Sequence, residues 1–231
     1  MANTRKSSCN LGERVTDALS SLVPRGSSLL VGLSGGVDSV VLLHLLAHIS
    51  PRFSWRLGAM HVHHGISPQA DAWAAFCREL CEHYSVPLQI ERVDITPLRD
   101  MGIEAAARQL RHAALARQPA DFIVLAHHRD DQAETLLLQL LRGAGVRGAS
   151  AMPLLKPRHD GAALLRPLLD AQRSELEAYA REHGLRWVED ESNQDICYPR
   201  NFLRHQVLPV LAQRFPAYRA TLGRSARHFA E

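Results

Sequence analysis

One segment near the N-terminus constrains the fold more than any other. The apolar run Leu29-Leu30-Val31-Gly32-Leu33 leads into Ser34-Gly35-Gly36-Val37-Asp38-Ser39, and a helical pattern of apolar residues begins at once. This order predicts a buried strand, a glycine turn and the start of a helix. Such a turn leaves backbone N–H groups at the positive end of a helix dipole, which stabilises an anion. Gly35 and Gly36 lack a Cβ, so their backbone can approach a phosphate closely.

The glycine loop does not have a Walker A sequence, because no Gly-Lys-Ser/Thr follows it. It resembles the pyrophosphate loop (PP-loop) of the N-type ATP pyrophosphatases, which cut ATP between its α and β phosphates and adenylate a substrate. The resemblance implies that Ser34, Gly35, Gly36, Val37, Asp38 and Ser39 bind ATP and that Asp38 places Mg²⁺. From the residues alone, an ordinary glycine turn is the alternative.

Strand and helix patterns alternate along most of the chain. Strands are predicted over residues 28–33, 56–62, 88–93 and 121–126, and helices over 11–22, 38–49, 67–84 (with Ser67 as N-cap), 102–117 and 130–142. This alternation predicts an α/β, Rossmann-like parallel sheet with helices on both faces. A short strand at 163–165 and helices at 172–183, 200–213 and 216–229 predict a small helical C-terminal region. We therefore expect an ATP-binding catalytic domain over 1–150, continued by a basic, helical segment over 151–231.

Composition and charge narrow the setting. The 46% apolar content of 231 residues supports a large core, and no apolar run reaches the length of a membrane span. The four cysteines show neither a disulfide framework nor zinc spacing, so we expect a reducing cytoplasm. Between Ile196 and Ala230 the chain has six arginines and no acidic residue. This basic arm favours a polyanion partner, and a solvated helix face is the equal alternative.

Further motifs follow the glycine loop in a fixed order. They are His61-Val62-His63-His64-Gly65-Ile66-Ser67, Glu104–Arg111, Ala126–Thr135, Arg142–Gly145, Arg166-Pro167-Leu168-Leu169, Trp187–Asn193 and Arg200-Asn201-Phe202-Leu203-Arg204. Together they resemble the tRNA(Ile)-lysidine synthetase family over roughly residues 28–230. The resemblance implies a reaction in which ATP activates the C2 position of the wobble cytidine of tRNA(Ile) with a CAU anticodon. Free L-lysine then displaces AMP and forms lysidine.

Individual residues have chemistry that suits this reaction. Arg108 and Arg111 are three residues apart on one helix, so both guanidinium groups can face a phosphate, with Arg108 preferred for the α phosphate and Glu104 holding it in place. Asp131 and Glu134 have the same spacing and could form an acidic pocket for the lysine ammonium. His128, before His127, could accept the lysine proton, and His61 could line the nucleotide pocket. A surface ion pair for Arg108 and a metal cluster for the histidines are the alternatives.

Three alternatives and two further expectations stay open. A thiolase of the same superfamily would need a Cys-x-x-Cys pair, and the sequence has none. An amidotransferase synthetase would need a source of ammonia, and a non-catalytic nucleotide-binding module would leave Asp131, Glu134 and Arg108 without a task. Many members of the family are dimers, so a homodimer is possible. Many also continue into C-terminal domains that bind the tRNA. We therefore expect this chain to bind ATP and lysine, and we expect full tRNA affinity to need such domains.

Overall fold

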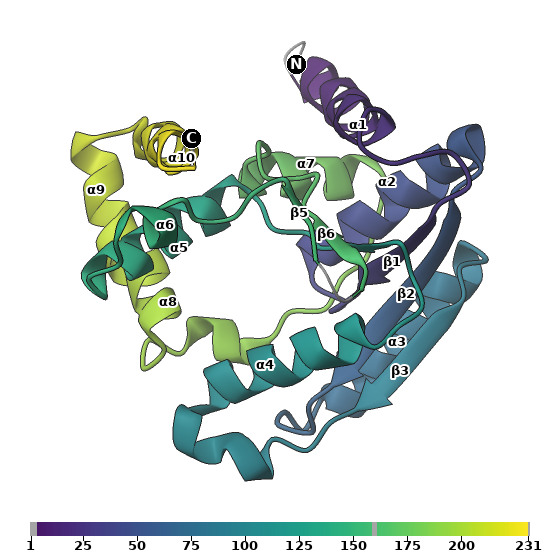
Figure 1. Cartoon of the computed structure of the whole chain (residues 1–231), viewed down its shortest axis with the longest axis horizontal. Helices are drawn as coiled ribbons and strands as arrows, with labels where there is room; N and C mark the ends of the chain where they lie inside the picture. Colours follow the sequence, from purple (N-terminus) through teal and green to yellow (C-terminus); the bar gives the residue numbers. More distant parts are fainter. Residues whose placement is uncertain (1–3, 159–160, 231) are drawn as a thin grey trace.

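The computed structural model describes residues 4–158 and 161–230, and within them one mixed sheet organises the chain (Figure 1). The sheet has six strands in the order β3-β2-β1-β4-β6-β5. The parallel strands are β1 (Ser28–Gly32), β2 (Arg56–His63), β3 (Leu88–Arg92), β4 (Phe122–Val124) and β6 (Ala163–Leu165), and β5 (Leu155–Lys156) pairs antiparallel with β6. Because β1 lies between β2 and β4, their carboxyl ends meet at one edge of the sheet, where ligands of open α/β sheets bind.

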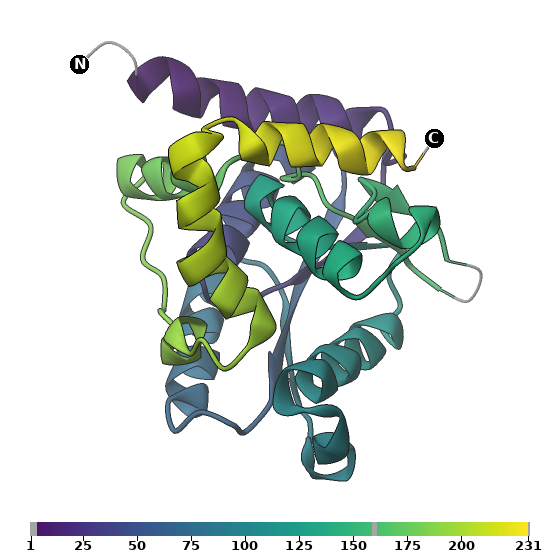
Figure 2. The same ribbon diagram turned by 90° about the vertical axis from the view of Figure 1, so that its left-hand side faces the viewer.

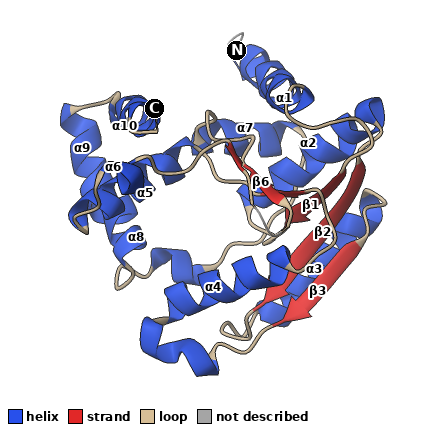
Figure 3. Cartoon of the chain, in the orientation of Figure 1, coloured by secondary structure: helices blue, strands red, loops and turns tan. Residues whose placement is uncertain are grey.

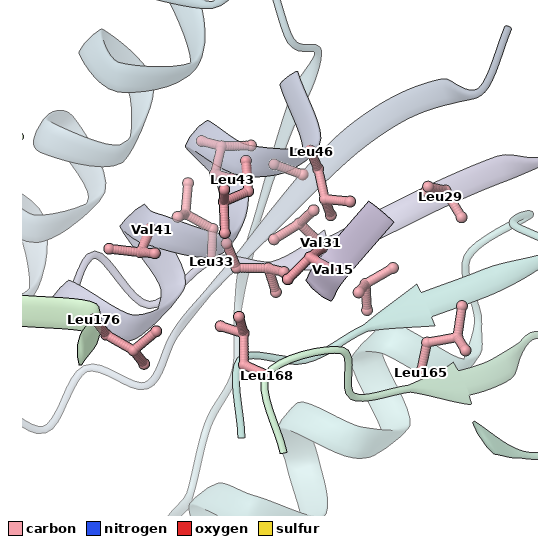
Figure 4. Packing of buried hydrophobic residues seen from close by; sticks show 14 of the residues in the cluster. Val15, Leu29, Val31, Leu33, Val41, Leu43, Leu46, Leu165, Leu168 and Leu176 are labelled. Atoms are coloured by element: carbon pink, nitrogen blue, oxygen red, sulfur yellow. The ribbon is translucent and has the colours of Figure 1, made fainter. Parts of the chain in front are cut away.

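Helices cover both faces of the sheet, as Figure 3 shows. On one face, α2 (Val37–Phe53) and α3 (Ala70–His83) pack on the strands, and α7 (Arg173–Glu182) and α1 (Thr4–Ser20) pack on α2 and on each other. On the other face lies α4 (Ile103–Ala116). Leu29 and Val31 belong to the first apolar cluster and Leu30 to the second, because successive strand residues point to opposite faces. Figure 4 shows the larger cluster, in which α2 leucines pack against the β1 side chains and Leu168.

A second group of helices packs beside the sheet (Figure 2). It consists of α5 (Arg129–Leu141), α6 (Val146–Ala149), α8 (Pro199–Phe202), a π-helical turn η3 (Leu203–Val207), α9 (Leu208–Arg214) and α10 (Tyr218–His228). Ala133 of α5 is buried with Leu208 and Tyr218, and Leu136 is buried with Ala149 and Ala226. These contacts fix the C-terminal helices to α5. Two short 3₁₀ helices, η1 (Thr96–Met101) and η2 (Glu191–Gln194), complete the described elements.

The predicted fold class is confirmed, with local differences. Ser67 is not the N-cap of α3, which begins at Ala70. Instead, its Oγ accepts a bond from the Gln69 N–H at 3.1 Å, which closes a local turn. The helix predicted over 200–213 is broken by the π turn, and β5 was not predicted, because two residues carry no readable period. Within the described residues no helix is both long and apolar enough to cross a membrane.

Candidate functional site

A deep cavity of about 1280 Å³ opens at the carboxyl edge of the sheet. Its walls come from the glycine loop, the end of β2, the start of α4, the turn after β4 and the C-terminal motifs. Of the candidate residues, those that line it are Ser34, Gly36, Val37, Asp38, Ser39, His61, Glu104, Arg108, Arg111, His127 and Asp131. Gly35, His128 and Glu134 do not line it. The topology therefore brings together motifs that lie about a hundred residues apart in the chain.

The glycine loop forms the start of α2, with Gly36 as N-cap and no side chain capping the first turn. Ser39 Oγ accepts a bond from the Gly35 N–H at 3.1 Å and donates to the Gly36 carbonyl at 2.9 Å, which makes the turn rigid. Gly35 has φ +92°, a conformation that favours glycine. The first-turn N–H groups of α2 have no intrahelical acceptors, so the loop fits a phosphate chain.

Asp38 supplies the only carboxylate in the first turn of α2. Its Oδ1 is buried and has no hydrogen-bond partner, which fits an oxygen that binds a cation. Among the described residues, no group of three or more His, Cys, Asp or Glu could hold a metal by itself. Proteins often hold Mg²⁺ through one or two carboxylates together with substrate phosphates. Asp38 thus fits the predicted metal ligand.

Two residues behind the loop support it. His61 is buried, and its Nδ1 lies 2.9 Å from the Leu33 carbonyl and 3.5 Å from Cys77 Sγ. Burial lowers the pKa of His61, so the ring is neutral and Nδ1 donates to Leu33. From the C-terminal part, the Val188 N–H donates to the Gly35 carbonyl at 3.0 Å. The glycine loop is therefore held from both sides by residues far from it in the sequence.

Arg108 and Arg111 project from α4 and line, with Glu104, the opposite wall. Burial and the nearby Arg200 lower the pKa of Arg108, and burial with Arg108 lowers that of Arg111 to about 10. Neither guanidinium lies within ion-pair distance of a carboxylate in the described part of the chain, Glu104 included. Two cations without anionic partners therefore face the cavity, which is the arrangement a phosphate requires.

The predicted acidic pocket is only partly open. Glu134 is 1% exposed, and both of its carboxylate oxygens accept bonds from arginines of the C-terminal motif. Arg200 Nε lies 2.7 Å from Oε2, and Arg204 Nε lies 2.7 Å from Oε1. Asp131 lines the cavity and lies 3.4 Å from Arg200. Asp131 also lies 3.7 Å from Arg204, and its Oδ2 accepts the His128 backbone N–H at 2.9 Å. Both carboxylates are thus engaged by the chain, but Asp131 lines the cavity and Glu134 does not.

The two neighbouring histidines differ in position. His128 is the N-cap of α5 and is 2% exposed, with Nε2 3.6 Å from Asp38 and 3.5 Å from Asp131. Burial alone would lower the pKa of His128, but Asp131 and Asp38 raise it. In turn, burial would raise the pKa of Asp131, but His128 and Arg200 hold it at about 2. His127 lines the cavity, and burial lowers its pKa to about 3, so its ring is neutral. His128 therefore connects Asp38 to Asp131, whereas His127 faces the ligand space.

Most of the basic arm is engaged within the chain. Arg200 and Arg204 bind Glu134, Arg219 binds Asp130, and Arg227 lies 3.5 Å from Asp170. Asn201 donates to the carbonyls of Ser192 and Asp195 at 2.8 and 2.9 Å. The sequence left a polyanion partner and a solvated helix face open for this arm. In the structure four of its six arginines pair with carboxylates of the same chain and tie the C-terminal region to the catalytic region.

Sequence reasoning assigned no role to one arginine near Arg108 and to several residues that line the cavity. Arg166 is 5% exposed and donates to the Pro153 carbonyl at 3.0 Å, and burial and Arg108 lower its pKa to about 10. Trp73 and three residues of α7 (Arg173, Glu177, Arg181) line the cavity. The motif Arg166-Pro167-Leu168-Leu169 could have indicated Arg166. The three α7 residues have the pattern of surface charges, so no pattern in the sequence indicated them.

The fold and the site define an α/β domain whose glycine loop lies at the carboxyl edge of a mainly parallel sheet, the arrangement of nucleotide-binding domains. The chain belongs to the PP-loop domain family, whose model matches residues 8–211. The tRNA(Ile)-lysidine synthase of Nitrosomonas europaea is 53% identical over 208 residues, which are 89% of this chain and 45% of that protein. That of Pseudomonas fluorescens is 53% identical over 204 residues, 87% of this chain and 46% of that protein. The resemblance seen in the sequence is confirmed, and the chain spans about half the length of these relatives.

Solved structures share the fold at low sequence identity. The U34-tRNA thiolase NcsA from Methanococcus maripaludis has a TM-score of 0.83 at 19% identity, covering 99% of this chain and 80% of that one. NMN synthetase from Francisella tularensis has a TM-score of 0.52 at 14% identity, covering 100% and 97%. At these identities the likeness shows the architecture only.

Proposed function

We propose that this chain is the ATP- and lysine-binding part of a tRNA(Ile)-lysidine synthase. One observation carries the proposal: the glycine loop, two arginines without anionic partners and the Asp131 carboxylate line one cavity. The identity to lysidine synthases supports the same assignment. The substrates would be ATP, free L-lysine and a tRNA(Ile) with a CAU anticodon, and the location would be the cytoplasm. A homodimer remains a prediction.

Each residue has a task in this proposal. ATP with Mg²⁺ supplies the adenylyl group that activates the cytidine. The loop Ser34–Ser39 binds the phosphates, and Asp38 holds the metal ion. Arg108, with Arg111, stabilises the negative charge that develops at the α phosphate.

The acidic end of the cavity suits lysine. Asp131 accepts the lysine ammonium, while Glu134 becomes reachable only when Arg200 and Arg204 withdraw. A neutral imidazole can take the proton that the amine must lose before it attacks. His127 lines the cavity, but it is a weak base because burial lowers its pKa to about 3. His128 is the more basic ring, since against the effect of burial Asp131 and Asp38 raise its pKa, so His128 stays the first candidate for this step.

The alternatives have less support. Cys77 and Cys81 are buried and burial raises their pKa values to about 12 and 11, so they are poor sulfur carriers, and Cys197 lies apart as a single exposed thiol. A nucleotide-binding module would not need two free arginines opposite the phosphate loop.

The experiment measures pyrophosphate release from ATP and Mg²⁺ with and without tRNA(Ile) bearing the CAU anticodon, followed by incorporation of labelled lysine. RNA-dependent release with lysine transfer supports the proposal. Release without transfer points to another adenylating enzyme. ATP binding without release points to the nucleotide-binding module.

A further inference from the structure

A second chamber adjoins the main cavity, beyond the carboxyl ends of β2 and β3. Its volume is about 510 Å³, within the range of roughly 300–1,000 Å³ typical of ligand sites. His63, His64, Gly65, Ile66 and Ile103 line both spaces, so the chamber is reached from the main cavity. Arg92, Val93, Asp94, Ile95 and Thr96 line the chamber alone. None of the roles proposed above uses it.

Two histidines of the chamber have buried ring nitrogens without a hydrogen-bond partner, while Arg92, Asp94 and Thr96 on its rim are exposed. His63 is 5% exposed, and its Nε2 lies 3.2 Å from Asp71 Oδ1, while its Nδ1 is buried without a hydrogen-bond partner. His64 Nδ1 is likewise buried without a partner. Buried polar atoms normally have partners, so these two nitrogens indicate a ligand that can hydrogen-bond.

The charges of the chamber disfavour an anion. Arg92 is bound to Asp71 at 2.6 Å, so its charge is already compensated. Burial lowers the pKa of His64 to about 4, so that ring is neutral near pH 7. A neutral imidazole offers one donor and one acceptor, which suits an uncharged group with both on its edge.

The remaining walls are apolar. Ile66, Ile95 and Ile103 line the chamber, and Ile66 and Ile103 are 45% and 39% exposed, an unusual degree for isoleucine. A flat, uncharged ring with a polar edge matches such walls. Unpaired RNA bases have this chemistry, because proteins bind them by contacts to both faces and by hydrogen bonds to the edge.

We propose that this chamber is a subsite for the unpaired base next to the nucleotide that the enzyme modifies. The inference rests on the proposed function, because it needs a target base in the main cavity. The flanking base then lies beside it, past His63 and His64. The base fills the chamber, and the polar groups on its edge form hydrogen bonds with the unpartnered nitrogens of His63 and His64.

Thr96→Trp tests the subsite, because Thr96 lines this chamber and not the main cavity. Met101→Trp is the matched control: it places the same side chain on the same short helix, at a residue that is 54% exposed and lines neither space. The probe is a fluorescent anticodon stem-loop RNA with a CAU anticodon. Two comparison RNAs lack the base on the 5′ side or the base on the 3′ side of the target cytidine. Free AMP and UMP are tested as competitors of stem-loop binding.

If the subsite is real, Thr96→Trp weakens stem-loop binding about 10-fold or more, and Met101→Trp leaves it unchanged. Removing one flanking base weakens binding to the wild type to a similar extent, and it has no further effect on Thr96→Trp, because both changes empty the same contact. His63→Phe, which keeps the ring shape but removes the nitrogens, reduces the same preference while ATP binding is retained.

Additive effects of Thr96→Trp and base removal overturn the subsite, as does unchanged binding by Thr96→Trp. Failure of the wild type to bind the stem-loop also overturns it. If Thr96→Trp weakens the binding of AMP or UMP but not of the stem-loop, the chamber binds a free nucleotide. That result overturns the proposal that an RNA base occupies it. Lysine transfer is measured in a separate assay. Stem-loop binding without lysine transfer refutes the proposed function. The subsite is then still tested by whether the effects of Thr96→Trp and base removal on binding are additive.

Discussion

Arg204 donates to both carboxylate oxygens of Glu134, from Nε to Oε1 at 2.7 Å and from Nη2 to Oε2 at 2.9 Å, across 70 residues of sequence. Arg200 joins them through Nε at 2.7 Å, so one buried carboxylate is shared by two guanidinium groups. This cluster fastens the start of the C-terminal helices to α5, next to Asp131 and the cavity. The residues predicted to bind substrate are thus also residues that hold the two regions together.

Removing the charge of Glu134 should therefore destabilise the fold. Glu134→Gln leaves two partly buried arginines without their carboxylate, and we expect a loss of about 3–5 kcal/mol in the free energy of unfolding. Urea unfolding measures this value. Glu177→Gln is the control, because Glu177 binds Arg173 and Arg181 at the protein surface and should cost at most about 1 kcal/mol. Equal losses in the two variants would contradict the structural role of Glu134.

Arg108 should matter for activity and not for stability. Its guanidinium lines the cavity and forms no ion pair or hydrogen bond with the described residues, so Arg108→Ala removes no ion pair that holds the fold together. We expect RNA-dependent pyrophosphate release to fall by about 10²- to 10³-fold, with the unfolding midpoint unchanged. Arg117→Ala at the end of α4 is the control, since Arg117 pairs with Glu91 away from the cavity. A similar rate for both variants would remove Arg108 from its proposed role.

Local patterns predicted much of this molecule from the sequence. The strand over 28–33, the glycine turn and the helix over 38–49 were predicted because apolar period and glycine placement are local signals, and the structure has them at Ser28–Gly32 and Val37–Phe53. The enclosure of Glu134 was not predicted, because a spacing of three residues shows only that Asp131 and Glu134 share a helix face. Its partners come from residues 200 and 204, and no local pattern indicates such a distant pair.

The basic arm shows the same limit. Six arginines without an acidic residue indicate an excess of charge, and the sequence cannot tell whether that charge meets an RNA or an earlier part of the chain. In the structure four of them pair with Glu134, Asp130 or Asp170. Similarly, His127 and His128 are adjacent in sequence, yet the turn into α5 places one in the cavity and buries the other.

Gly35 should not tolerate a side chain. Its φ is +92°, and a Cβ there would lie 2.9 Å from Val188 Cγ2 and 3.3 Å from Cys77 Sγ. Gly35→Ala should cost about 1–2 kcal/mol for the backbone alone and also weaken ATP binding, because the loop must shift. Gly184→Ala is the control, since Gly184 has φ +62° but nothing within 4 Å of its Cβ. Calorimetric titration with ATP separates the two, and equal ATP affinities would refute a role for close packing at Gly35.

Acid should destabilise the protein through His44, which packs on α7. Its ring lies 5.5 Å from Tyr179 and 4.9 Å from His183 between centroids, and its Nδ1 lies 2.9 Å from Tyr179 Oη. Burial, followed by His48, His183 and His83, lowers the pKa of His44 to about 4. As the pH falls, His44 binds a proton near pH 6.5 in the unfolded chain but only near pH 4 in the folded chain. The contribution of His44 to the free energy of unfolding is therefore fully present above pH 6.5 and is lost as the pH drops towards 4.

Between pH 7 and 5 this one histidine should account for about 2 kcal/mol of lost stability. His44→Phe removes the titrating group, so its free energy of unfolding should fall by about 2 kcal/mol less than that of the wild type over this range. Tyr179→Phe removes the hydrogen bond but keeps the imidazole, and it should retain the wild-type pH dependence. Urea unfolding at several pH values gives the three curves. A His44→Phe curve parallel to that of the wild type would show that His44 is not the group that senses acid.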